Sequence, residues 1–177
     1  VAIVAADAGS DSVTTTGVGA DLTGTENELK AAGIIFKDVE TASLDGQALA
    51  GSDLTDTFSL QSASLAANAA TVLLANAIEF KNLSSTIDAS GGEDTVNGFA
   101  DVDWTLGGTN SVTSTNGYTF NNIEIVDVAS QTLNGTAGAD AFTVNNADQV
   151  IANEITFNRV AIVAADAGSD SVTTTGV

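Results

Sequence analysis

The sequence predicts an all-β fold, a parallel β-solenoid of tandem modules of about 40 residues each. First, the stretch VAIVAADAGSDSVTTTGV occurs twice, as Val1–Val18 and Val160–Val177, so the chain holds one period of 159 residues and the start of the next. Second, four segments inside this period repeat one apolar frame around a phenylalanine. Third, 44% of the residues are hydrophobic, mainly Ala, Val, Ile and Leu, and there is no proline, which is typical of many short strands joined by tight turns.

The repeated frame defines four modules. The segments GIIFKDVE, AIEFKNLS, GYTFNNIE and EITFNRVA are centred on Phe36, Phe80, Phe120 and Phe157. An apolar residue stands two positions before each phenylalanine and another three positions after it: Ile34, Ile78, Tyr118 and Ile155 before, and Val39, Leu83, Ile123 and Val160 after. We therefore place the modules at about 1–50, 51–92, 93–138 and 139–159, the last continuing into the next identical repeat, 160–177.

Each module is predicted to run from a Gly-x-Asp turn through a strand, a polar loop and a second strand to the Phe frame, followed by a further strand and a turn. Alternation of large apolar and polar residues supports strands at Ala141–Val144 and Ile155–Phe157. The composition of Ser64–Phe80 would permit a helix, but its place in the module alignment predicts strand or loop. We expect stacked coils about 4.8 Å apart, with the Phe frames forming one internal stack.

The alternative fold is a string of small antiparallel β-sandwich modules. A module of about 40 residues is short for an independent β domain, and the chain has no cysteine that could form a stabilising disulfide. These facts favour the solenoid.

The charge balance restricts the partners. The chain has 23 acidic and 4 basic residues, a net charge of −19, which repels nucleic acid and anionic membranes. It contains no apolar run long enough to insert into a membrane. The expected partners are neighbouring repeats of the same chain and, through self-association into fibres, other copies.

The absence of histidine and cysteine restricts the chemistry. It excludes Ser-His-Asp and Cys-His catalysis and leaves only oxygen ligands for metal ions. We therefore predict that the protein is not an enzyme.

The candidate metal ligands are the aspartates of the Gly-x-Asp turns: Asp11, Asp53, Asp94, Asp140 and Asp170. In the second module the alignment is ambiguous, because DTFSLQ from Asp56 resembles DAFTVN from Asp140 more closely. Aspartates that recur at coil corners could bind Ca²⁺ between coils, since this ion takes six to eight oxygen ligands. The alternative is that they are solvated turn residues, because aspartate and glycine also favour tight turns.

A second candidate site is the segment FADVDW. Asp101 and Asp103 would project from one face of a strand next to Trp104, and paired carboxylates near an aromatic ring are found in glycoside hydrolases. The simpler interpretation is an exposed acidic face. A binding version of this hypothesis uses Trp104 and Tyr118 to hold a glycan.

The segments TLNGTAGADAFTV, ITFNRV and DAGSDSVTTTG resemble the units of giant bacterial β-strand-repeat surface proteins, near the filamentous-haemagglutinin-like and RTX-like adhesins. The resemblance spans the whole chain, although the dense G-G-x-G-x-D run of calcium β-rolls is missing. It implies a secreted or cell-surface protein whose repeats form stalks or filaments for adhesion or biofilm matrix building, often with calcium. The expected function is thus that of a structural repeat, with a calcium-dependent glycan- or surface-binding adhesin segment as the alternative.

Overall fold

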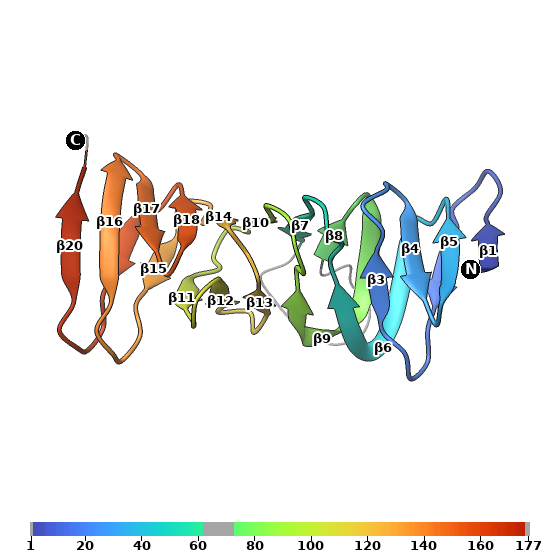
Figure 1. The fold of residues 1–177 in the computed structure, drawn as a ribbon, viewed down its shortest axis with the longest axis horizontal. Coiled ribbons are helices and arrows are strands. Elements are labelled where there is room, and N and C mark those ends of the chain that lie inside the picture. Colours follow the sequence, from blue (N-terminus) through green and yellow to red (C-terminus); the bar gives the residue numbers. More distant parts are fainter. Residues whose placement is uncertain (1, 62–72, 176–177) are drawn as a thin grey trace.

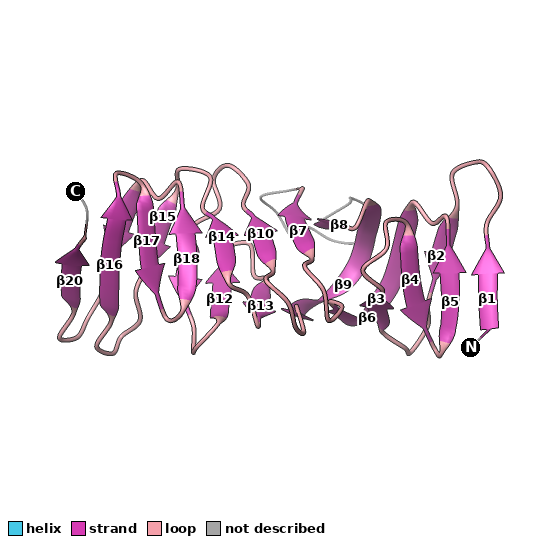
Figure 2. Cartoon of the chain, turned by 45° about the horizontal axis from the view of Figure 1, so that its top comes forward, coloured by secondary structure: helices cyan, strands magenta, loops and turns pink. Residues whose placement is uncertain are grey.

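The computed structural model describes residues 2–61 and 73–175, and in these residues it contains twenty strands and no helix. The strands wind into a parallel β-solenoid with β1 at one end and β20 at the other (Figures 1 and 2). The all-β prediction and the solenoid prediction are both confirmed.

Two sheets face each other along the solenoid, and the chain alternates between them. In order of pairing, the first sheet contains β1 (Ala2–Ala5), β5 (Ile34–Lys37), β4 (Glu28–Ala31), β3 (Ala20–Leu22), the second halves of β6 (Thr41–Ala50) and β9 (Ile78–Asp88), then β13 (Thr119–Asn121), β12 (Ser111–Ser114), β11 (Trp104–Leu106), β15 (Thr132–Asn134) and β19 (Ile162–Ala164). The second sheet contains β2 (Ser12–Thr14), the first halves of β6 and β9, then β8 (Leu73–Ala75), β7 (Thr57–Leu60), β10 (Thr95–Asn97), β14 (Ile125–Asp127), β18 (Ile155–Asn158), β17 (Gln149–Ala152), β16 (Ala141–Asn146) and β20 (Ser171–Thr174).

Each module contains an antiparallel meander of three strands inside the parallel solenoid. The meanders are β3-β4-β5, β7-β8-β9, β11-β12-β13 and β16-β17-β18, and the third strand of each carries the module phenylalanine. The sequence analysis did not predict that these strands pair antiparallel. Three of the hairpins place both turn residues at positive φ, which matches the twist of the flanking strands: Ala32–Gly33, Asn76–Ala77 and Asn153–Glu154.

The meanders alternate between the sheets. After each Phe strand the chain adds one strand to each sheet, so the next meander lies in the sheet opposite the previous one. Phe36 and Phe120 consequently lie in the first sheet, and Phe80 and Phe157 in the second. The expected single stack of the four module phenylalanines is therefore wrong.

The core lies between the two sheets. Phe80, Phe120 and Phe157 are fully buried, and the ring of Phe120 contacts those of Phe58 and Trp104, with ring centres 6.1 Å apart in both pairs. Phe36 is only partly buried, because it lies near the end of the stack beside β1.

The segment Ser64–Phe80 forms strands where it is described, at β8 and at the start of β9. The part of this segment within residues 62–72 lies outside the described residues. The described part agrees with the strand prediction rather than with a helix.

Candidate functional site: a carboxylate ladder at one corner

A row of acidic residues follows the corner where the chain enters the second sheet. Each stands immediately before a strand of that sheet: Asp11, Glu40, Asp56, Asp94, Glu124, Asp140 and Asp170 precede β2, β6, β7, β10, β14, β16 and β20. We call these seven residues the corner ladder.

One hydrogen-bond rule connects neighbouring members of the corner ladder. The backbone N–H of one acid donates to the carboxylate of the acid in the next coil. The four bonds are Asp11 to Glu40 (2.7 Å), Asp56 to Asp94 (2.7 Å), Asp94 to Glu124 (2.9 Å) and Asp140 to Asp170 (3.0 Å). The backbone carbonyl of the first acid in each pair accepts an N–H from the first strand residue of the next coil. The carboxylates thus continue the sheet hydrogen bonding around the corner.

The ladder is divided into three groups by the meanders of the second sheet. Between the strand that follows Glu40 and the strand that follows Asp56 lie β9 and β8, and between those that follow Glu124 and Asp140 lie β18 and β17. The longest group is therefore Asp56, Asp94 and Glu124.

Two ladder carboxylates also hold the loop that precedes them. Asp56 Oδ2 accepts the N–H (2.6 Å) and the hydroxyl (2.9 Å) of Ser52, and Asp140 Oδ2 accepts the N–H of Thr136 (2.6 Å). The shared pattern is Gly-Ser/Thr-x-x-x-Asp, in GSDLTD and GTAGAD. An added Cβ at Gly51 would lie 2.1 Å from the Ala89 carbonyl oxygen, so the first position of this loop requires glycine. This pattern is visible in the sequence, but it differs from the Gly-x-Asp spacing by which the candidate ligands were chosen.

Asp94 is the most perturbed acid of the ladder. Its side chain is fully buried, and Oδ2 has no hydrogen-bond partner, while Oδ1 accepts the Asp56 N–H. Loss of hydration raises its pKa to about 6, and the charges of Asp56 and Glu124 act in the same direction. The hydrogen bond from Asp56 opposes this rise.

The structure places four of the five predicted metal ligands in the corner ladder: Asp11, Asp94, Asp140 and Asp170. Asp53 is exposed and lies outside it, and Asp56 occupies the equivalent position. Of the five, Asp140 and Asp170 are hydrogen-bonded to each other, the Asp140 N–H donating to Asp170 Oδ1. Within residues 2–61 and 73–175, no group of three or more acidic side chains is arranged to hold a metal ion.

The candidate carbohydrate site is not assembled. Asp101 lies in a turn with φ of 65°, and Asp103 accepts the Thr132 N–H (2.9 Å), so neither lies in the strand that begins at Trp104. Trp104 and Tyr118 are 0% and 2% exposed. The prediction that these rings hold a glycan is wrong, because both rings are buried in the core.

No protein-family model matches the chain, and neither a curated protein nor a solved structure does. In the described part of the chain, no helix has the length and hydropathy needed to cross a membrane.

Proposed function

We propose that this chain is a structural repeat of an extracellular or cell-surface filament, adhesin stalk or matrix protein, without catalytic activity. The observation that carries the proposal is the continuity of the coil stack where one period ends and the next begins. The second copy of the repeated stretch joins the first period through β15–β19 and β16–β20 pairing, in the same two sheets as β1 and β2. Repeats joined in this way form a rod without linkers.

The mechanical basis is a combination of apolar core and backbone hydrogen bonds. Parallel pairing links each coil to the next, and the corner ladder adds a hydrogen bond at the bend. A pull along the axis would load many of these bonds together. The net charge of −19 favours solubility of such a rod, and the resemblance to surface-protein repeats supports an extracellular location.

The proposal can be tested with chains of one, two and three tandem periods. Electron microscopy or small-angle scattering should show a rod whose length rises linearly with the number of periods at constant width. A chain of separate beads, or a compact particle, would contradict the proposal. Surface labelling of the source cells with an antibody against the repeat tests the location independently.

A calcium-dependent adhesin segment is the second candidate function. It is favoured by two buried carboxylate oxygens without a hydrogen-bond partner, Asp11 Oδ2 and Asp94 Oδ2. Sedimentation velocity in millimolar calcium and then in chelator tests it. A calcium-induced change that Asp94→Asn removes and Asp53→Asn retains would support a site in the ladder; identical profiles would rule against calcium-gated assembly.

A further inference from the structure

The corner ladder contains the same group of three acids twice in each period. The first group is Asp56, Asp94 and Glu124, which we call the inner triad. Its first acid closes the loop GSDLTD, its middle acid stands in a Gly-x-Asp turn, and its third acid is a glutamate.

The second group spans the junction between two periods, and we call it the junction triad. Its first acid, Asp140, closes the loop GTAGAD, and its middle acid, Asp170, again stands in a Gly-x-Asp turn. Asp170 occupies the position of Asp11 in the repeated stretch, and Glu40 follows Asp11 in the ladder. A period that continues into the next therefore contains the same order of acids as the inner triad.

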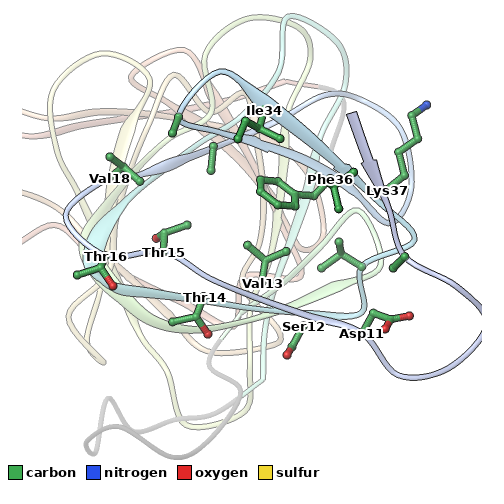
Figure 3. A pocket seen from close by; sticks show the side chains of 15 residues that line it. Asp11, Ser12, Val13, Thr14, Thr15, Thr16, Val18, Ile34, Phe36 and Lys37 are labelled. Carbon is green, nitrogen blue, oxygen red and sulfur yellow. The ribbon is translucent and has the colours of Figure 1, made fainter. Parts of the chain in front are cut away.

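The middle acid is bonded in the same way in both triads. Its Oδ1 accepts the N–H of the acid before it, and its own N–H donates to the glutamate after it. Figure 3 shows Asp11 at the corner where the chain enters β2. The four bonds are Asp56 to Asp94 (2.7 Å), Asp140 to Asp170 (3.0 Å), Asp94 to Glu124 (2.9 Å) and Asp11 to Glu40 (2.7 Å).

The second oxygen of the middle acid is buried and has no hydrogen-bond partner in either triad. These atoms are Asp94 Oδ2 and Asp11 Oδ2. The preceding coil bonds Oδ1, as at Asp170, so the ladder rule supplies no partner to Oδ2 when periods are joined. An ionised oxygen without water or a donor is costly, and a bound proton removes its charge.

Close stacking of the loops accompanies this burial. A Cβ added at Gly92 would clash with the Leu54 carbonyl oxygen, and one at Gly168 with the Gly138 carbonyl oxygen. Leu54 and Gly138 each stand two positions before the first acid of a triad. The glycine of the Gly-x-Asp turn therefore allows the preceding loop to pack directly onto the loop of the middle acid.

The charges around the middle acid of the inner triad are negative. Burial raises the pKa of Asp94 to about 6, and the charges of Asp56 and Glu124 act in the same direction. Asp53 in the preceding loop and Glu93 in the same loop are exposed acids.

The middle acid of the junction triad also has acidic neighbours. Besides the ladder acids on both sides, they are Asp7 and Asp38 in the adjoining loops. Lys37 precedes Asp38, but its Nζ lies 2.9 Å from a carboxylate oxygen of Glu28, which is outside the ladder. The Lys37 charge is thus paired elsewhere.

A proton fits this site better than a metal ion. Ca²⁺ takes six to eight oxygen ligands. In the part of the chain that the structure describes, no three acidic side chains are arranged to hold a metal ion. A proton needs a single oxygen, and each triad has one such oxygen buried without a partner.

We propose that the middle acid of each triad is a proton-binding site, through which a tandem array becomes more stable on mild acidification. The inference rests on the proposed structural repeat and adds a regulation to it. The folded state holds the proton more tightly than the unfolded state, so the added stability is present at low pH and is lost as pH rises through about 6.

The first test is a carbon-13 NMR titration of the side-chain carboxyl groups of the full chain between pH 7.5 and pH 5. The Asp94 signal, identified by its loss in Asp94→Asn, should titrate with a midpoint of about 6. Asp53 is the exposed control and should stay largely ionised, since an ordinary aspartate titrates at about 3.9. Millimolar calcium should leave the Asp94 midpoint unchanged.

The second test uses a chain of two periods, in which Asp170 lies between Asp140 and the second copy of Glu40. On acidification from pH 7.5 to pH 5, Asp170→Asn should take up about one proton fewer than wild type and gain less stability in urea unfolding. Asp53→Asn in the same chain is the charge-matched control and should nearly match wild type in both measurements.

The inference is overturned if Asp94 titrates with the exposed aspartates, if calcium lowers its midpoint, or if Asp170→Asn takes up as many protons as wild type. Small-angle scattering of the two-period chain separates these results from a failure of the proposed function. A linear rod would leave the repeat function standing without proton binding, whereas a compact particle would contradict the repeat function itself.

Discussion

Asp94→Asn is the most informative single substitution in the corner ladder. The carboxyl is fully buried between Asp56 and Glu124, and its Oδ1 accepts the Asp56 N–H. The amide keeps an oxygen for this bond and removes the charge. We therefore expect the variant to be more stable than wild type at neutral pH.

The magnitude follows from the pKa, which is raised from 3.8 to about 6. The folded state binds the proton more tightly than the unfolded state, so the free energy of unfolding falls as pH rises from about 4 through about 6. Complete ionisation costs at most about 3 kcal/mol, and solvent screening reduces this figure. The asparagine variant has no charge to bury at this position. Its free energy of unfolding relative to wild type should therefore increase by about 1 kcal/mol between pH 5 and pH 7.5.

The assay is urea unfolding followed by the fluorescence of Trp104, the single tryptophan, which is buried in the core. Measurements at pH 5 and pH 7.5 stay above the pI of about 4.1, where precipitation would interfere. Asp53→Asn, at an exposed residue, is the charge-matched control and should show no comparable pH-dependent gain. Asp94→Ala should lose about 1–3 kcal/mol relative to Asp94→Asn at both pH values, because it leaves the Asp56 N–H unpaired.

A lower stability of Asp94→Asn at pH 7.5 would refute this reasoning. So would an advantage that does not change with pH, since it would show that burial of the charge is not the cause.

Two further predictions concern the coil itself. Gly51→Ala should strongly lower the free energy of unfolding, because its Cβ would clash with the Ala89 carbonyl oxygen, whereas Gly108→Ala, with no atom within 4 Å, should leave it nearly unchanged. Phe120→Ala should lower the free energy of unfolding by about 3–5 kcal/mol because of the cavity it creates, whereas Phe99→Ala, at a residue 39% exposed, should lower it much less. Chemical unfolding of the four variants tests both predictions.

The apolar frame of the modules was predictable from the sequence because inward positions need large apolar residues in every coil. Two residues before Phe80 and Phe157, Ile78 and Ile155 are fully buried, as the frame required. Partner choice was not predictable in this way. A strand alternates its faces whether its neighbour is parallel or antiparallel, so the antiparallel pairing within each meander left no distinct pattern in the sequence.

The site was predicted in kind but not in detail. Aspartates at coil corners were expected, and Asp94, Asp140 and their coil neighbours do lie there. The choice of Asp53 over Asp56 followed the Gly-x-Asp spacing, whereas the structure selects the acid immediately before the strand. Glu40 and Glu124 were missed because a longer acid can fill the same role without a preceding glycine.

The alternation of the meanders explains why an identical stretch can recur after four modules. Each module shifts the next meander to the opposite sheet, so only an even number of modules returns the chain to its starting sheet. β19 and β20 accordingly lie in the same sheets as β1 and β2. With an odd number of modules, the strand that carries Val163 would lie in the second sheet, where Val13 lies, rather than in the first sheet with Val4. The acidic residue before the next strand would then stand at the corner that leads into the first sheet, outside the corner ladder. Exact repetition of both the core and the ladder therefore requires the even module count that this period has.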